Sequence, residues 1–131
     1  MATRITIIKI RRPQHSNINH ELQWLGSSLG LFGLRDKDKS CFRLFIELIK
    51  NTKQGKSMTS DQLANKLKLS RGTVVHHLHK LQDSGIVVNE EKGYLLRVNM
   101  LKILISEIEK DTRRTLEDMK EIADEIDKKL R

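Results

Sequence analysis

Residues 59–87, TSDQLANKLKLSRGTVVHHLHKLQDSGIV, carry two helix patterns separated by a turn of only a few residues. Thr59 and Gln62 have the spacing of a capping box, which predicts that the first helix occupies residues 60–68. Apolar residues at steps of three and four predict a second helix over residues 71–83. The stretch therefore predicts two helices joined by a tight turn.

The turn between these helices constrains how they pack. Ser70 is expected to cap the second helix, and Gly85 is expected to end it. Helices that cross steeply over a short turn must approach closely, and Ala64 is the small residue that allows this approach. The wedge between the helices would be filled by the apolar side chains Leu63, Leu67, Leu69, Val74, Leu78 and Leu81.

The residues that follow Gly85 change from a helical to an extended pattern. Residues 86–88 and 94–98 are rich in apolar residues, and residues 89–93 between them end in glycine, which predicts a β-hairpin. The order helix, short helix, turn, helix and hairpin is that of a winged helix-turn-helix. We therefore expect a mainly α fold with a small β-wing.

Another helix is predicted directly before this unit, over residues 39–50, with Asp36 or Asp38 as its N-cap. Its apolar residues recur at steps of three and four, which is typical of a helix with one buried face. Residues 51–57 are expected to form a polar, basic loop to the next helix. We expect residues 37–98 to form one winged helix-turn-helix domain.

The N-terminal part, residues 1–36, is predicted to be an arm made of a strand and a helix. Residues 4–12, RITIIKIRR, alternate β-branched and polar side chains, which predicts a short strand that Pro13 ends. Residues 17–29 carry apolar side chains on one helical face and predict a helix. Trp24 is expected to pack between the arm and the domain.

The C-terminal part, residues 99–131, contains neither glycine nor proline and predicts one long helix. From Met100 onward this helix would be about 48 Å long at 1.5 Å per residue, which is too long for the preceding domain to cover. Pairing with a second copy is therefore favoured over folding back onto the same domain. The predicted dimerisation residues follow steps of three and four: Leu101, Leu104, Ile108, Thr112, Thr115, Met119, Ile122, Ile126 and Leu130.

The stretch from Thr73 to Val87 matches the run T-V-x-x-H-L-x-x-L-x-x-x-G-[IL]-[VI] position by position. With this run, the chain resembles the winged-helix core of ArsR-like transcriptional regulators, particularly archaeal ones, over roughly residues 40–98. The resemblance implies sequence-specific binding to double-stranded DNA, with residues 70–84 as a recognition helix in the major groove. It implies nothing about a particular operator or effector.

The resemblance also implies that His77 packs partly buried and that the wing grips the minor groove. Glu90 and Glu91 depart from this expectation because acidic side chains repel phosphate, so Arg97 on the return strand is the alternative contact. Once the apolar face of the second helix is buried, its remaining side chains point outward toward base edges and phosphates. The predicted DNA-binding residues are Thr59, Ser60, Ser70, Arg71, Gly72, Thr73, Val75, His76, His79, Lys80, Lys92 and Arg97.

Composition narrows the classes of function. The formal net charge is +8 at pH 7, and the positive excess lies before residue 86, which suggests a polyanionic partner for that part. No apolar run is long enough to cross a bilayer and no signal peptide is evident, so we expect a cytoplasmic protein. The single cysteine, Cys41, excludes an internal disulfide and a multi-cysteine metal site, and it is expected in the core.

No catalytic arrangement of residues stands out, so we expect neither an enzyme nor a cofactor. The histidines His76, His77 and His79 raise the question of a metal site. Adjacent helical positions point about 100° apart, so His76 and His77 cannot easily share an ion, and only His76 with His79 remains as a candidate pair. Groove contacts and one packed histidine explain these residues better than a metal does.

These observations predict a homodimeric DNA-binding transcription regulator, and analogy with the family suggests a repressor. Two alternatives stay open. A nucleic-acid or chromatin-associated protein without sequence preference would show steep salt dependence but no preferred site. A winged helix used for protein assembly would be apolar where Arg71, His76 and His79 are polar.

Overall fold

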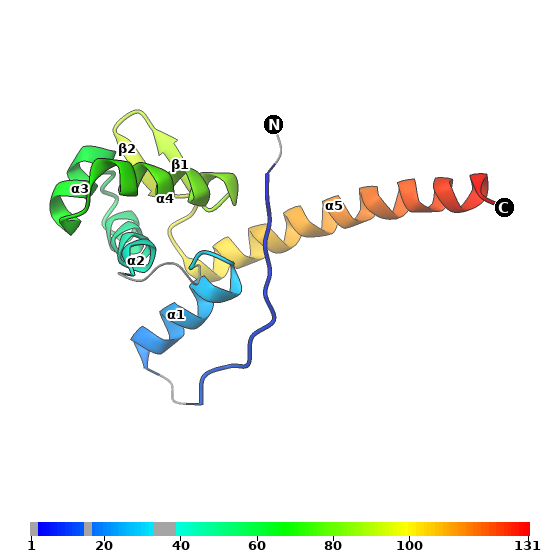
Figure 1. The fold of residues 1–131 in the computed structure, drawn as a ribbon, viewed down its shortest axis with the longest axis horizontal. Coiled ribbons are helices and arrows are strands. Elements are labelled where there is room, and N and C mark those ends of the chain that lie inside the picture. Colours follow the sequence, from blue (N-terminus) through cyan, green and yellow to red (C-terminus); the bar gives the residue numbers. More distant parts are fainter. Residues whose placement is uncertain (1–2, 15–16, 33–38) are drawn as a thin grey trace. The chain divides into compact units, whose positions relative to one another are not determined.

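The computed structural model describes residues 3–14, 17–32 and 39–131. In this part of the chain it contains five helices and one two-stranded antiparallel hairpin (Figure 1), which confirms the predicted mainly α fold with a β-wing. The chain divides into two compact units, residues 1–99 and residues 100–131. The elements are α1 (Ile18–Ser28), α2 (Ser40–Lys53), α3 (Ser60–Leu67), α4 (Arg71–Asp83), β1 (Val87–Glu90), β2 (Gly93–Leu96) and α5 (Leu101–Lys129).

The core of the first unit forms where α2, α3 and α4 pack against one another. Leu44, Phe45 and Leu48 of α2 are fully buried, and the hairpin packs on α2 through β2 and on α4 through β1. The predicted wedge between α3 and α4 is present: Leu63, Ala64, Val74, Leu78 and Leu81 are all buried. Leu67 and Leu69 are only partly buried, because they lie at the edge of this contact.

The predicted caps of the two central helices are also present. Thr59 Oγ1 accepts a hydrogen bond from the Gln62 amide (3.2 Å), and the Gln62 side chain accepts one from the Thr59 amide (2.9 Å). Ser70 Oγ accepts a hydrogen bond from the amide of Thr73 (3.1 Å). These side chains satisfy amide groups that the first turn of a helix leaves unpaired, so they fix where α3 and α4 begin.

The ends of α3 and α4 have the same hydrogen-bond pattern but different residues in the left-handed position. The amide of Leu69 donates to the Ala64 carbonyl (3.0 Å), and the amide of Ile86 donates to the Leu81 carbonyl (3.1 Å). The left-handed residue is Gly85 after α4 (φ 75°) but Lys68 after α3 (φ 56°). Since a side chain disfavours this conformation, the turn of the helix-turn-helix stores strain that the end of α4 avoids.

The hairpin that follows α4 has a tighter turn than the sequence predicted. Glu90 pairs with Gly93, so the turn consists of Glu91 and Lys92 alone, and the strands extend into the residues assigned to the loop. Gly93 lies directly against the backbone of Met58, where an added Cβ would be 2.4 Å from the Met58 carbonyl. The Tyr94 amide donates to that carbonyl (2.8 Å), which fastens the hairpin to the chain before α3.

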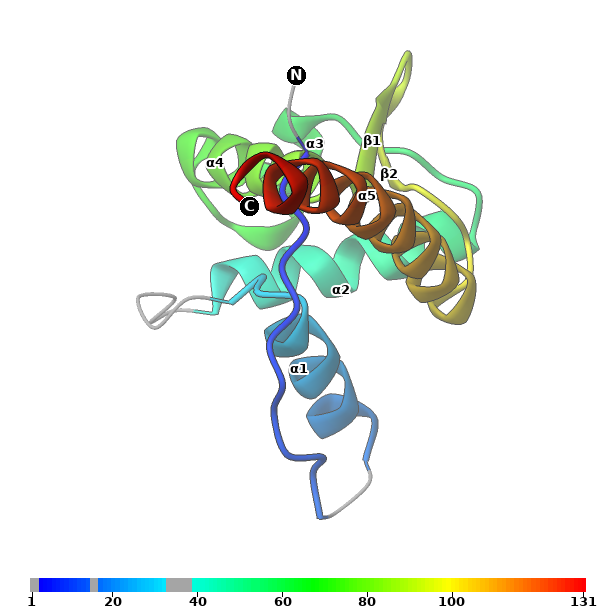
Figure 2. The ribbon, with the colours of Figure 1, turned by 90° about the vertical axis from the view of Figure 1, so that its right-hand side faces the viewer.

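The N-terminal strand predicted for residues 4–12 is wrong. These residues form no strand, because no second strand lies beside them in the described part of the chain. Their amides bond to the ends of helices instead: Arg4 donates to the Asp83 carbonyl (2.8 Å), and Ile8 donates to the Ser28 carbonyl (2.7 Å). The segment runs beside α1 (Figure 2), as the hydrogen bond from Trp24 Nε1 to the Ile10 carbonyl (3.2 Å) confirms.

The helix predicted for residues 39–50 is longer than expected. The candidate caps Asp36 and Asp38 lie outside the described residues, and Lys39 precedes the helix without a side-chain cap. The helix continues to Lys53 because Thr52 is buried in the core. The Thr52 hydroxyl donates to the Leu48 carbonyl (2.7 Å) and accepts from the Leu96 amide (3.0 Å), so this supposed loop residue joins α2 to β2.

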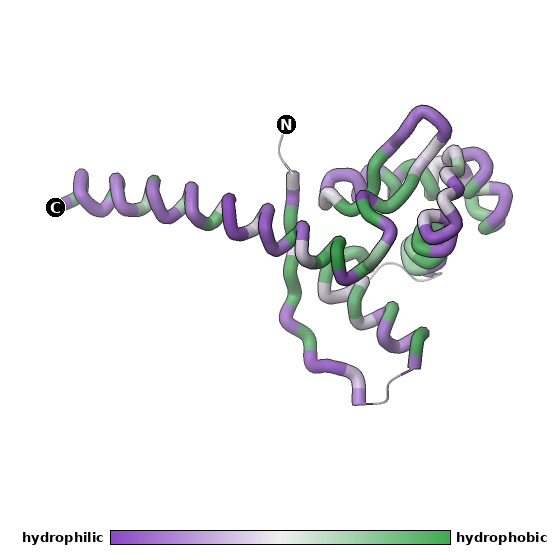
Figure 3. Tube along the Cα trace, turned by 180° about the vertical axis from the view of Figure 1, so that it is seen from behind, coloured by the Kyte–Doolittle hydropathy of each residue, from purple (hydrophilic) through white to green (hydrophobic). Residues whose placement is uncertain are grey.

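The second unit is a single uninterrupted helix, α5, of 29 residues. Hydrophobic and hydrophilic residues both occur along it, and its distal part is mainly hydrophilic (Figure 3). Oppositely charged side chains four residues apart pair along it, as Arg113 does with Glu109 (3.7 Å) and Lys128 with Asp124 (3.0 Å). No helix among the described residues is both long enough and apolar enough to cross a membrane.

Candidate nucleic-acid interface

The side of α4 that faces away from the core is the predicted DNA-reading surface. Val74, Leu78 and Leu81 are buried, so the opposite side of the helix is presented to solvent. That side exposes Arg71, Gly72, His76, His79 and Asp83, while Thr73 and Val75 are partly exposed. A solvent-facing helix with polar side chains in its first turns has the shape and chemistry that the major groove accepts.

The hydroxyl-bearing residues of the predicted set lie at the starts of α3 and α4. Thr59 and Ser70 are exposed and hold the caps of the two helices. The Ser70 hydroxyl also donates to Thr73 Oγ1 (2.8 Å). The hydrogen bonds of Thr59 and Ser70 thus have a structural role. Ser60, the first residue of α3, is partly exposed.

Arg71 lies at the start of α4 and reaches back to α3. Its Nε is 3.1 Å from Asp61 Oδ1, and both side chains are 72% exposed. An ion pair so exposed contributes little to stability, because water screens it. A phosphate or a base edge could therefore replace Asp61 as the partner of the guanidinium at little cost.

Lys80 does not point where the sequence suggested. Its Nζ donates to the carbonyl of Leu31 (3.2 Å), and the side chain is partly buried. The ammonium group therefore ties α4 to the segment after α1 rather than lying free for a phosphate. His77 similarly ties α4 to α2, since its Nε2 forms a hydrogen bond with Ser40 Oγ (2.7 Å), which agrees with the expected packing role.

The two predicted wing residues are not brought together. Lys92 is exposed at the hairpin turn, next to the exposed side chains of Glu90 and Glu91. Arg97 is partly exposed at the base of the hairpin, where its amide donates to the Ile86 carbonyl (2.9 Å). The tip of the wing therefore presents two acids and one base, while the second basic group lies at the other end.

A hollow beside α4 contains a residue that the sequence analysis missed. It measures about 590 Å³ and is lined by Arg4, Thr6, Gly30, His76, His79, Lys80, Asp83 and Ser84. Arg4 comes from the N-terminal segment and is exposed. The basic character of this segment was visible in the sequence, but no local spacing shows that it passes α4.

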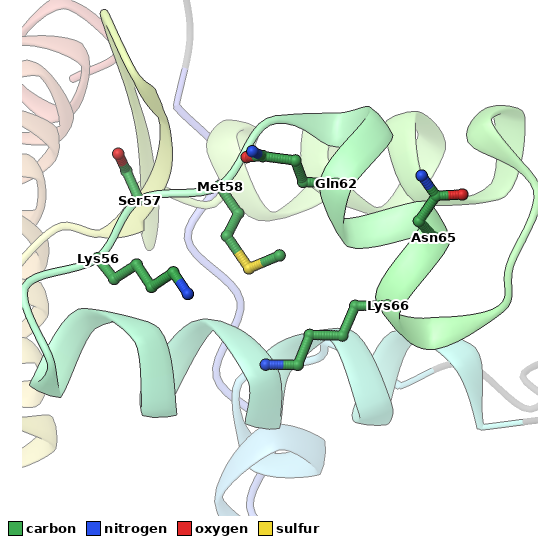
Figure 4. Close-up of a pocket in the computed structure, with 6 residues that line it drawn as sticks. All are labelled: Lys56, Ser57, Met58, Gln62, Asn65 and Lys66. Carbon is green, nitrogen blue, oxygen red and sulfur yellow. The ribbon is translucent and has the colours of Figure 1, made fainter.

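A second hollow lies over α2 and α3 (Figure 4). It measures about 420 Å³ and is lined by Lys56, Ser57, Met58, Gln62, Asn65 and Lys66. Lys66 Nζ lies 2.7 Å from Oε2 of Glu47, a carboxylate that is itself buried. This pairing neutralises one of the two cations of the hollow, which makes it a weaker anion site than the surface of α4.

The described residues contain no group of three or more His, Cys, Asp or Glu side chains that could hold a metal ion. His76 and His77 lie with ring centroids 5.6 Å apart and at an angle of 57°. Cys41 is buried in α2, and its Sγ lies 3.2 Å from the Leu31 carbonyl oxygen, which agrees with the expected core position.

Comparison with known families identifies the segment that carries this surface. Residues 48–88 match the family model described as bacterial regulatory protein, arsR family. The match begins in α2, covers α3 and α4 and ends in β1, which is about a third of the chain. The comparisons with curated proteins and with solved structures gave no match. The chain thus carries an ArsR-like winged helix-turn-helix, the DNA-binding domain of a family of transcription regulators.

Proposed function

We propose that this protein is a homodimeric, sequence-specific regulator of transcription that inserts α4 into the major groove of double-stranded DNA. The observation that carries this proposal is the exposed polar side of α4, formed by Arg71, Gly72, His76 and His79 on a helix whose other side is fully packed. The backbone of a helix held in this way is already ordered before binding, so only its exposed side chains lose freedom when DNA binds.

Gly72 supports contact with a partner outside the fold. A Cβ added at this position would meet nothing within 4 Å, so the fold itself does not require glycine there. Glycine early in a helix lowers helix stability, yet it lets another molecule approach the backbone closely. The edge of a base pair or a sugar-phosphate backbone would use that space in the proposed complex.

The dimer is proposed from the exposed apolar side chains of α5. Met119, Ile122 and Ile126 are 59%, 54% and 49% exposed, and they follow the steps of three and four that paired helices use. Of the other predicted dimerisation residues, Leu101 and Thr112 are partly exposed, Thr115 and Leu130 are exposed, and Leu104 and Ile108 are buried. A second copy of α5 would cover the exposed stripe.

A two-fold dimer would present two recognition helices to successive major grooves about 34 Å apart, on a pseudo-palindromic site. We propose residues 37–98 as the DNA-binding domain, residues 1–36 as an arm and residues 99–131 as the dimerisation helix. Binding at a promoter would exclude polymerase, so repression is the proposed direction of control. Nothing in this mechanism calls for a catalytic step.

The test is to select bound duplexes from a random pool and to titrate the enriched sites with wild type and with Arg71→Ala. Enrichment of an inverted repeat that Arg71→Ala no longer prefers is the expected result. Lys50→Ala, which removes an exposed charge from α2, is the matched control and should keep the preference. An enriched site that Arg71→Ala still prefers would contradict the assignment of α4 as the reading helix.

A nucleic-acid binder without sequence preference is the second candidate, favoured by the net charge of +8. The same selection distinguishes it, because such a protein would bind DNA in a strongly salt-dependent way and enrich no site. Failure to bind any duplex would instead indicate a winged helix used for protein assembly.

A further inference from the structure

We propose that Arg4 holds a phosphate of the DNA backbone beside the C-terminal half of α4, so that the N-terminal segment is part of the DNA-binding surface. This inference rests on the proposed function and adds a contact outside the matched segment, residues 48–88. The hollow described above is its structural basis. Three parts of the first unit line it: the N-terminal segment, the turn after α1, and α4 with the residue that follows it.

The course of the N-terminal segment past α4 is fixed by several contacts. The Arg4 amide donates to the Asp83 carbonyl (2.8 Å), which anchors the segment at the end of α4. Thr6 packs against the turn after α1, because a Cβ at Gly30 would lie 2.6 Å from Thr6 Cγ2. Chain ends are usually poorly ordered unless they are tied down in this way. The backbone of Arg4 is therefore already in place before any ligand binds.

The charges around the hollow give Arg4 a specific role. The ammonium group of Lys80 is engaged with the Leu31 carbonyl, and Asp83 adds an exposed carboxylate that would repel a phosphate. Arg4, which is exposed, adds a guanidinium to the lining, and a guanidinium can hold a phosphate through two parallel hydrogen bonds. His76 and His79 line the same hollow, and their ring nitrogens can form hydrogen bonds.

The position of the hollow favours a phosphate that belongs to DNA. Gly72, His76, His79 and Asp83 follow one another at helical steps along the exposed side of α4, and the last three of them line the hollow. The start of a recognition helix lies deepest in the groove, and the backbone of the flanking strand passes its far end. The phosphodiester that flanks the groove would therefore pass close to Arg4.

The test compares Arg4→Gln with Lys9→Gln, which removes an exposed charge from the same segment outside the hollow. Each variant is titrated with a selected duplex, or with a mixed-sequence duplex if no site is enriched, at several salt concentrations. Losing one phosphate contact should reduce the slope of log affinity against log salt by about 0.9 per bound protomer. Arg4→Gln should show this loss and Lys9→Gln should not. Arg4→Lys should keep the slope, because lysine also neutralises a phosphate, but should bind more weakly because it cannot form two parallel hydrogen bonds.

Equal slopes for the two glutamine variants would overturn the inference while leaving the proposed function intact. Absence of any duplex binding by the wild type would overturn both. Titration of inorganic phosphate into isotope-labelled protein distinguishes a DNA phosphate from a free phosphate as the ligand of the hollow. Saturation of the hollow with inorganic phosphate that displaces no DNA would indicate a small-anion site and would also overturn the DNA contact. Thermal unfolding of each variant checks that the exposed substitutions leave the fold unchanged.

Discussion

The helices that form the core of the first unit bury their apolar side chains, whereas the distal part of α5 exposes them. Leu44, Phe45, Leu63 and Leu78 are completely buried, whereas Ile122 in α5 is 54% exposed. An isolated helix is marginal in water, because most helix stability in proteins comes from packing an apolar face. The first unit therefore has its own source of stability, while the distal part of α5 needs a partner to gain the same benefit.

The largest expected effect is a loss of packing in the core of the first unit. Leu78→Ala leaves a cavity at the contact of α3 with α4 and should lower the free energy of unfolding by about 2–5 kcal/mol. Urea denaturation followed by circular dichroism measures this loss. Val75→Ala on the same helix, at a partly exposed site, is the control, and an equal loss there would contradict the packing described.

The next largest effect is a loss of self-association through α5, while the first unit stays folded. Ile122→Glu places a charge in the proposed seam of α5 and should weaken self-association at least tenfold, about 1.4 kcal/mol, because the charge would be buried without a partner. Sedimentation over a range of concentrations measures the change. Glu121→Gln, on an exposed neighbouring position, should associate like the wild type. A dimer that survives Ile122→Glu unchanged would show that α5 is not the interface.

The smallest expected effect is a gain in the stability of the first unit alone. Lys68 has a left-handed conformation that costs a side chain roughly 1–2 kcal/mol, and part of the gain from glycine is offset in the unfolded chain. Lys68→Gly should therefore raise the free energy of unfolding by about 0.5–1 kcal/mol without changing self-association. Calorimetry measures it, with Asn65→Gly at an exposed position inside α3 as a control that should destabilise. A destabilised Lys68→Gly variant would disprove strain at this turn.

The helix-turn-helix could be predicted because its signals are local. The capping box of Thr59 and Gln62, the cap at Ser70 and the glycine at position 85 each act within one helical turn. The apolar spacing around Leu78 adds the buried face. Such signals depend on neighbours in the sequence, so they predict the elements without knowledge of the tertiary structure.

The errors arose where distant residues decide the outcome. The β-branched pattern of residues 4–12 correctly indicates an extended backbone, but a strand also needs a partner, and here the amides bond to helix ends. Thr52 lies in a polar stretch that is typical of a loop. It is nevertheless buried, because its hydroxyl accepts a hydrogen bond from the Leu96 amide of β2. The surroundings of Lys80 and Arg4 also depend on distant residues: the Lys80 ammonium group bonds to the Leu31 carbonyl, and the Arg4 amide bonds to the Asp83 carbonyl at the end of α4.

The anchoring of α4 has a consequence for how a signal could control this protein. Its first residue is paired with Asp61 of α3, its middle is bonded to Ser40 of α2 through His77, and Lys80 near its end is bonded to the segment after α1. The exposed pair with Asp61 can be exchanged for DNA at little cost, but the hydrogen bonds of His77 and Lys80 still hold α4 to α2 and to the segment after α1. In the proposed dimer, we therefore expect that a signal releases DNA by changing the distance between the two first units, because each α4 keeps its own bonds to the rest of its unit.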